Sequence, residues 1–428
     1  MTRSCAPAWA RPRSARRSAT RCPRWWTRTR SSTGGPRLAP RRERARRGPR
    51  VAHSTILHVR STCGLYGAER ALLSLAASTP SPWRAQVCSL ISPGRVDVLS
   101  GAVREQGLDA LTLEVPGRFS AMAVATLASE IRRRGVGLLH AHDYKSLTLG
   151  AAASALAGVP LVATYHGDTG ATPALIAYEG LARVLGNCTH AVAAVSRELT
   201  ARLRRYVHRS PVVYIPNALP LADMCTDEER LQAREALGLA PEGAVIAMVG
   251  RLSVEKGPQV LLDAMQRLAR TPGATVPTLL LVGDGPLREP LEAQAQGLPV
   301  RFLGFRSEVR SVYAAADAVV MPSLREGMPL VALEAMALGR PLVASGVGEL
   351  PHVLGTGRGL VVPPGDAGTL ASALAGLLTA PGWRTRMAQA AREYVVTHHA
   401  PERMARRYIE SLYLPALMDS REAQVAAG

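Results

Sequence analysis

Residues 244–257, with the sequence AVIAMVGRLSVEKG, combine a buried strand, a loop bounded by glycines and the start of a helix. The apolar run Ala244–Val249 predicts a strand that is buried on both faces. A helical pattern starts after Gly257, so Arg251 and Lys256 lie in the loop at the carboxyl end of this strand. Such a strand–loop–helix unit is typical of a parallel α/β sheet.

The same unit recurs along most of the chain. Further apolar runs that predict strands are found at Thr55–Val59, Ala85–Ile91, Ala110–Val115, Gly137–His142, Pro160–Tyr165, Ala191–Ser196, Pro211–Ile215, Thr278–Val282, Val300–Leu303, Ala318–Met321, Leu342–Ala344 and Leu360–Val362. Helical patterns are found at Ala68–Ala77, Ala121–Arg133, Ser196–Arg204, Pro258–Leu268, Leu287–Gln296, Ser307–Ala315, Pro329–Leu338 and Ala367–Leu378. This alternation predicts an α/β protein with two Rossmann-like, doubly wound domains that face a central cleft, where the ligand should lie at the carboxyl ends of the strands.

The pattern divides the chain into four parts. Residues 1–50 have no apolar period and predict a disordered, Arg-rich extension. Residues 51–220 and 221–395 are predicted to form the two Rossmann-like domains, with a polar linker near their boundary at Leu219–Arg230. Residues 396–428 contain a final amphipathic helix.

The net charge of +19 belongs mostly to the N-terminal extension. Residues 1–50 contain 16 arginines and one acid, Glu43, which leaves +4 for the other 378 residues. A basic arm can bind nucleic acid or anionic lipid, but a solvated tail is the simpler interpretation. Composition therefore does not indicate a nucleic-acid partner for the folded part.

Cysteine usage and hydropathy indicate a cytoplasmic protein. The six cysteines form no CxxC pair, so neither a zinc site nor a disulfide framework is predicted. The first 50 residues have no sustained apolar stretch of the kind found in signal peptides. The most apolar region, Leu147–Thr164, contains two glycines and a proline, and it predicts a buried helix and a strand rather than a membrane span.

A second motif, Arg325–Glu334, follows the predicted strand Ala318–Met321. Pro329 is suited to the first position of a helix. Gly327 and the free amides near Leu330 can then meet an anion at the helix start.

The charged residues of these two motifs suit the two halves of a sugar nucleotide. Arg251 and Lys256 are two cations beside a helix start, which suits a diphosphate. Glu326, in the loop, and Glu334, more than one turn inside the helix, can each accept two hydrogen bonds from paired hydroxyl groups of a sugar or a ribose. The alternative for each is a solvated charge on a loop or a helix face.

The first domain carries weaker motifs. Gly67 lies in a glycine loop that enters a helix, where backbone can approach a phosphate closely, although the loop is not GxGxxG. His140, His142 and His166 lie at carboxyl ends of predicted strands, and a neutral histidine there can donate to a reacting oxygen. A structural role is equally open for His140 and His142, whereas Gly167 leaves His166 accessible.

Taken together, these segments resemble the large GT-B glycosyltransferase family, family 4, which includes retaining α-mannosyl- and glucosyltransferases. The matching segments occur in the same order along the chain as in that family, over roughly residues 54–420. The matching segments are Gly67-Ala68-Glu69, His166-Gly167, Val195-Ser196, Ile215-Pro216-Asn217, Gly250-Arg251, Lys256-Gly257, Gly283-Asp284-Gly285-Pro286-Leu287, Phe302-Leu303-Gly304 and the pair Glu326/Glu334. Two positions depart from the pattern, since Ala218 replaces a glycine and Tyr66 replaces a small residue.

The resemblance implies a role for each charged residue of the second domain. Arg251 and Lys256 match the cations that hold the donor diphosphate. Glu326 matches the acid that contacts the transferred sugar, and Glu334 matches the acid on the ribose.

The resemblance also implies roles around these four residues. His166 matches a first-domain histidine near the reacting centre, Gly67 the glycine loop near the distal phosphate, and Arg306 a position close to the base. The catalytic set is then His166, Glu326, Arg251 and Lys256. The donor-binding set is Gly67, Arg251, Lys256, Gly283, Arg306, Glu326, Gly327, Leu330 and Glu334. The last helix resembles one that packs back on the first domain.

The activity implied is transfer of a hexosyl unit from a nucleoside-diphosphate sugar to a glycan or lipid-linked acceptor, with retention. No D-x-D motif occurs in the chain, so we expect neither a metal nor a cofactor. The loops Arg118–Met122 and Asp168–Leu175 should select the acceptor, with peripheral contact at the inner membrane face if it is lipid-linked. Two alternatives stay open, a sugar-nucleotide epimerase or hydrolase of the same fold, and a non-catalytic GT-B scaffold.

Overall fold

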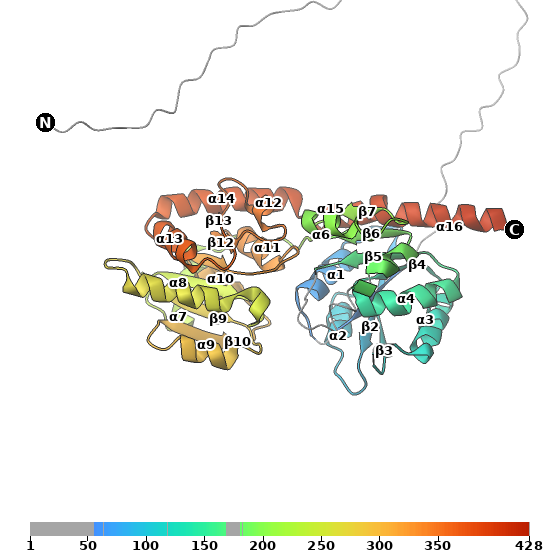
Figure 1. The fold of residues 1–428 in the computed structure, drawn as a ribbon, viewed down its shortest axis with the longest axis horizontal. Coiled ribbons are helices and arrows are strands. Elements are labelled where there is room, and N and C mark those ends of the chain that lie inside the picture. Colours follow the sequence, from blue (N-terminus) through green and yellow to red (C-terminus); the bar gives the residue numbers. More distant parts are fainter. Residues whose placement is uncertain (1–54, 63, 118, 168–179, 182, 428) are drawn as a thin grey trace, which may run out of the picture. The chain divides into compact units, whose positions relative to one another are not determined.

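The structure of the protein is a computed structural model that describes residues 55–427 except 63, 118, 168–179 and 182. The predicted extension 1–50 lies outside the described residues. Two parallel sheets form the framework, with helices packed on them (Figure 1). The α/β class with two doubly wound sheets is therefore confirmed, while the domain boundaries at 50, 220 and 395 stay predictions.

The first sheet has the strand order β3-β2-β1-β4-β5-β6-β7 and the second has the order β10-β9-β8-β11-β12-β13. The strands of the first sheet are β1 (Thr55–Ser61), β2 (Arg84–Ile91), β3 (Asp109–Glu114), β4 (Val136–Ala141), β5 (Leu161–Tyr165), β6 (Ala191–Ala194) and β7 (Val212–Tyr214). Those of the second are β8 (Val245–Val249), β9 (Thr278–Val282), β10 (Val300–Gly304), β11 (Ala318–Met321), β12 (Leu342–Ser345) and β13 (Leu360–Val362). Every predicted apolar run coincides with one of these strands.

The helices up to α12 lie between successive strands, and α13 to α16 follow the last strand, β13. They are α1 (Gly67–Ala77), α2 (Val98–Glu105), α3 (Ala121–Arg133), α4 (Tyr144–Ala157), α6 (Arg197–Leu203), α7 (Asp227–Ala236), α8 (Pro258–Arg270), α9 (Arg288–Gln294), α10 (Arg310–Ala315), α11 (Leu330–Ala337), α12 (Leu350–Leu354), α13 (Ala367–Leu378), α14 (Pro381–His398), α15 (Pro401–Tyr408) and α16 (Leu414–Ala427). Several begin at a side chain that accepts from a first-turn amide, as Ser120 does for α3 and Ser196 for α6. Of the helices in the described part of the chain, none combines the length and hydrophobicity needed to cross a membrane.

The structure corrects two sequence predictions about helices and contains a further helix that the sequence did not predict. The predicted linker at residues 219–230 runs into α7, because Thr226 and Glu229 form a capping box at its start. Helix α14 was not predicted; its apolar residues follow no clear helical period. Pro329 lies one residue before α11 in an extended conformation, so the first helical residue is Leu330.

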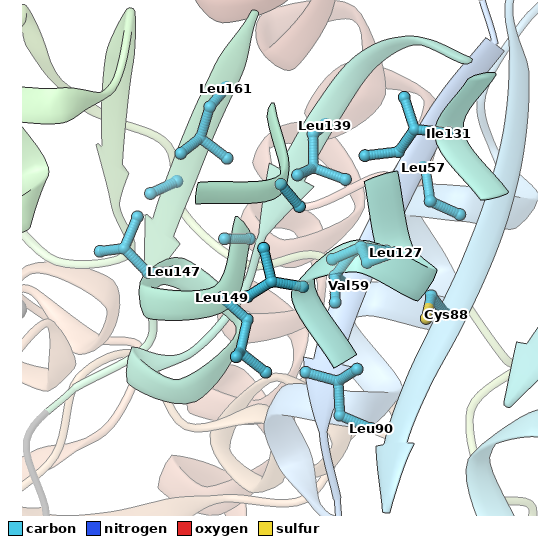
Figure 2. Close-up of a cluster of buried hydrophobic side chains, with 14 of the residues drawn as sticks. Leu57, Val59, Cys88, Leu90, Leu127, Ile131, Leu139, Leu147, Leu149 and Leu161 are labelled. Carbon is cyan, nitrogen blue, oxygen red and sulfur yellow. The ribbon is translucent and has the colours of Figure 1, made fainter. Parts of the chain in front are cut away.

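The core of the first domain shows why the strands are apolar on both faces. Leu57 and Val59 of β1 and Leu139 of β4 pack against Leu127 of α3 and Leu149 of α4 (Figure 2). These side chains are almost completely buried. Burying a leucine side chain contributes about 2 kcal/mol, so such a layer stabilises the sheet and fixes the ends of its strands.

The C-terminal segment returns to the first sheet. Helix α14 packs against α11 and α13 of the second domain, whereas α15 contacts α1. Between α15 and α16 the chain forms one π-helical turn, Ile409–Tyr413. Leu412 and Tyr413 of this turn share a buried cluster with Ile56 of β1.

Candidate active site

A cavity of about 880 Å³ lies where the strand order of each sheet reverses. The reversal falls between β1 and β4 in the first sheet and between β8 and β11 in the second. Ligands of doubly wound sheets bind at such switch points, beyond the carboxyl ends of the strands. The volume is within the range of about 300–1,000 Å³ that small-molecule sites occupy.

The structure brings all the predicted site residues together at this cavity. The residues that line it include Gly67, His166, Arg251, Lys256, Gly283, Arg306, Glu326, Gly327, Leu330 and Glu334. They come from loops and helix starts, and from one position inside α11, and they span 268 positions of the sequence, from 67 to 334. Their contacts with a donor stay predictions.

Lys256 and Glu326 form an ion pair across two loops of the second domain. Lys256 Nζ lies 2.7 Å from Glu326 Oε1, and Ser323 Oγ donates to the same oxygen at 2.8 Å. The loops are also joined through the backbone, since Leu324 N donates to the carbonyl of Glu255. Because side-chain and backbone bonds act together, the Glu326 carboxylate is held in one orientation at the cavity wall.

Glu334 is buried inside α11 but has two polar partners. Tyr313 Oη donates to Glu334 Oε2 at 2.8 Å, and Arg70 Nη1 lies 2.5 Å from Oε1. Burying a carboxylate is costly unless such partners compensate for the lost contact with water. Burial, together with the Glu334 charge, raises the pKa of Tyr313 well above its ordinary value, so the phenol remains a donor.

Two glycines are required where backbones meet at the cavity. A Cβ on Gly283, whose φ is +126°, would lie 1.9 Å from the carbonyl oxygen of Gly250. A Cβ on Gly327 would lie 2.5 Å from the carbonyl oxygen of His166. The second contact joins the loop before α11 to the loop after β5, so a side chain there would push the two walls of the cavity apart.

His166 is neutral on the first-domain wall. Burial, followed by the charge of Arg60, lowers its pKa to about 3. A neutral imidazole offers one donor and one acceptor but is a weak base. The start of α1, with Gly67, lines the same wall.

Sequence reasoning missed two arginines of this wall, Arg60 and Arg70. Arg60 lies at the end of β1, where its Nε donates to Glu69 Oε1 at 2.6 Å. Arg70 directly follows Glu69 in the first-domain motif. The signal was available, because a cation at the carboxyl end of a buried strand is a candidate for the cleft. The predicted acceptor loops give no test, since Arg118 and Asp168–Leu175 lie outside the described residues.

Comparisons with known proteins agree with this geometry. Residues 65–223 match Glycosyltransferase Family 4, and residues 243–380 match Glycosyl transferases group 1. The chain is 34% identical over 302 residues to D-inositol 3-phosphate glycosyltransferase of Actinosynnema mirum, covering 64% of this chain and 72% of that protein. It is 33% identical over 294 residues to D-inositol 3-phosphate glycosyltransferase 2 of Catenulispora acidiphila, covering 63% and 69%.

A solved structure shares the fold. The Anabaena protein HepE in complex with UDP-glucose aligns with a TM-score of 0.73 at 24% identity, covering 85% of this chain and 100% of that chain. The fold and the site thus define a GT-B glycosyltransferase. The chain belongs to the family 4, group 1 glycosyltransferases.

Proposed function

We propose that this glycosyltransferase moves a hexosyl unit from a nucleoside-diphosphate sugar to a glycan or lipid-linked acceptor, with retention and without a metal. The observation that carries the proposal is the convergence of Arg251, Lys256, Glu326 and Glu334 on one cavity. Two cations and two carboxylates there match the phosphates and the hydroxyl groups of such a donor.

The chemical difficulty is departure of the nucleoside diphosphate, which develops negative charge on a phosphate oxygen. Arg251 and Lys256 are cations that line the cavity, and Lys256 is held by Glu326. The amides at the start of α11 point their partial positive charge toward the same cavity. Groups already in place for this charge stabilise the transition state without reorganisation. This supports a reaction in which side-chain cations and helix-start amides stabilise the charge that a divalent metal stabilises elsewhere.

Retention is supported by the absence of a suitable base on the described part of the first-domain wall. An inverting enzyme needs a base beside the acceptor hydroxyl, with a pKa near the working pH. Asp143 is the carboxylate among the described residues of that wall, and its oxygens accept from Ser61 N, Ser61 Oγ and Ser146 N. His166, with its pKa of about 3, is a weak base. A phosphate oxygen of the departing donor can take the proton instead.

A polyol phosphate is a second candidate acceptor. Two relatives at 33–34% identity are named for D-inositol 3-phosphate. Arg60 and Arg70 place two guanidinium groups at the first-domain wall, where the acceptor should lie. Guanidinium groups bind phosphate well, so this acceptor class has a physical basis.

The test combines a donor screen with an acceptor screen. The binding of UDP-, GDP- and ADP-sugars is compared by thermal shift. A donor present at about 100 times its Kd should add about 2.7 kcal/mol to the free energy of unfolding. The cognate donor is then incubated with lipid-linked glycans or with inositol phosphate, in the presence and absence of EDTA. We expect release of the nucleoside diphosphate to require the acceptor and to continue in the presence of EDTA. The NMR coupling constant at the anomeric carbon of the product should show the same configuration as that of the donor.

Three other results each contradict one part of the proposal. Free monosaccharide formed without acceptor would favour a hydrolase or epimerase of this fold. Inverted product would overturn retention. Loss of turnover with EDTA that only a divalent metal restores would overturn metal independence.

A further inference from the structure

Four histidines lie together at the first-domain wall of the cavity, where His142 and His166 line the cavity and His58 and His140 lie behind them. His58 comes from β1, His140 and His142 from β4 and the residue after it, and His166 from the residue after β5. His58 and His140 are completely buried, and His142 is 2% exposed. Of the four, the proposed function uses His166 alone.

Three of these rings form a chain of hydrogen bonds that ends at His166. His58 Nδ1 lies 3.0 Å from His142 Nε2, and His142 Nδ1 lies 3.3 Å from His166 Nε2. Each ring is neutral, because burial lowers the pKa of His58 and of His166 to about 3 and that of His142 well below its ordinary value. A neutral imidazole has one donor and one acceptor nitrogen, so both hydrogen bonds of this chain must be donated in the same direction along it.

The chain of hydrogen bonds uses Nε2 of His166 and does not involve its Nδ1. Among the described residues, His166 Nδ1 and His58 Nε2 are buried nitrogens without a partner. If His58 donates to His142 and His142 donates to His166, the free N–H is on His166 Nδ1. The opposite order would place the unpaired N–H on His58, whose side chain is completely buried, whereas the side chain of His166 lines the cavity. The first order therefore places the uncommitted N–H on His166 Nδ1, in a residue that lines the cavity.

A second arm holds the chain from behind. The His140 ring lies 3.9 Å from that of His142, measured between centroids. His140 Nδ1 pairs with Tyr413 Oη at 2.9 Å, and His140 Nε2 pairs with Thr164 Oγ1 at 2.7 Å. Thr164 in turn donates to Tyr408 Oη. The two tyrosines belong to the C-terminal segment, so this segment supports the ring that packs on His142.

We propose that His142 and His58 are positioning residues for the transfer reaction, which fix the ring orientation and the protonated nitrogen of His166. This inference rests on the proposed function of the cavity. His142 and His58 act through His166 and need not touch the substrate.

A buried metal site is the competing interpretation of the same cluster. One nitrogen each of His58, His140 and His142 lies within 4.8 Å of the others. However, both nitrogens of His140 and of His142 already have hydrogen-bond partners. A dication would break these bonds and add charge to a group of neutral imidazoles in the core, which is costly.

A double-mutant cycle tests the positioning role. His142→Phe keeps a planar ring and removes both hydrogen bonds, and it is measured in the wild-type and the His166→Phe backgrounds. We expect His142→Phe to lower kcat about 10- to 100-fold, with the donor KM changed less than threefold. In the His166→Phe background the further loss should be under twofold. His58→Phe should give a smaller loss with the same coupling, whereas His142→Gln, which keeps one polar partner, should restore part of the rate.

The tautomer of His166 can be measured directly, which tests the positioning role without an activity assay. In protein labelled with ¹⁵N-histidine, long-range ¹H–¹⁵N spectra report which nitrogen of His166 carries the proton, and His142→Phe should shift its population. An equal loss of kcat in both backgrounds with an unchanged His166 tautomer would overturn the proposal, as would one equivalent of tightly bound zinc in the purified protein. Absence of any donor turnover by the wild type would instead count against the proposed function, while the tautomer result still decides the positioning role.

Discussion

Arg70 of α1 and Glu334 of α11 form an ion pair in which the nitrogen and the oxygen are 2.5 Å apart. The Arg70 side chain is 48% exposed and that of Glu334 is 7% exposed. The pair thus joins a helix start of the first domain to the acid that the family resemblance assigns to the ribose. Arg70 is half exposed, whereas Glu334 is buried and also accepts a hydrogen bond from Tyr313 through its other oxygen.

Removing the Tyr313 hydroxyl should destabilise the protein. Tyr313→Phe keeps the ring but leaves Glu334 Oε2 without its donor in a buried site, which costs about 1–3 kcal/mol. Urea unfolding with a common m-value measures the change. Tyr206→Phe, at a half-exposed tyrosine, is the matched control and should stay within about 0.5 kcal/mol of the wild type. Equal stability of the Tyr313 and Tyr206 variants would mean that the buried hydrogen bond contributes nothing.

Lys256 should matter for the chemical step. Lys256→Ala removes a fixed cation from the cavity and releases Glu326, and we expect kcat to fall about 10²- to 10³-fold. Steady-state kinetics with the cognate donor gives the value. The other lysine of the chain, Lys145, does not line the described cavity, and Lys145→Ala should keep kcat within about threefold. Near-normal turnover by Lys256→Ala would remove the leaving-group role assigned to this residue.

A methyl group at Gly327 should separate the two walls of the cavity. The added Cβ of Gly327→Ala would meet the carbonyl oxygen of His166 at 2.5 Å, a backbone atom that cannot rotate away. We expect at least a tenfold loss of kcat/KM, since a shift of about 1 Å near the chemistry can cost about 10²-fold. Gly376, inside α13, has open space around it, and Gly376→Ala should keep activity and add about 0.5–1 kcal/mol of stability. Unchanged kcat/KM in Gly327→Ala would show that the loop yields without consequence.

Stability should fall as the pH falls from 7 toward 3. In the folded state burial lowers the pKa of His58 to about 3, whereas in the unfolded chain it is about 6.5. The unfolded state then binds more protons over this range, so acid favours unfolding. At pH 5 this amounts to about 2 kcal/mol for one such histidine.

The pH prediction is checked by comparing slopes rather than absolute stabilities. The free energy of unfolding is measured at pH 8 and at pH 5, and the difference between the two values gives its slope with pH. His58→Gln should make this difference smaller by about 2 kcal/mol. His208→Gln, at an exposed histidine, is the control and should keep the wild-type slope. A slope in His58→Gln equal to that of the wild type would mean that His58 is not held neutral in the folded protein.

Most of the strands and many of the helices could be predicted because they depend on local sequence patterns. A strand buried on both faces requires a continuous apolar run, and each of the predicted runs became a strand. Helix α7 was missed because its capping box lies in a polar stretch that looks like a linker, and α14 because packing against α11 and α13 outweighs its weak helical period. That the proposed site residues would line one cavity could be predicted, because the carboxyl ends of parallel strands lie on one edge of a sheet.

The sequence by itself determined the class of the fold, the segments that we predict to carry the donor site, and the charges within them. Only the tertiary structure decided the partners of those charges: Glu326 with Lys256, Glu334 with Arg70 and Tyr313, and His166 with His142. The reason is the strand order. Local periodicity shows that β1 and β4 are strands but not that they are neighbours, and only that adjacency brings His58 within hydrogen-bond distance of His142, 84 positions away along the chain.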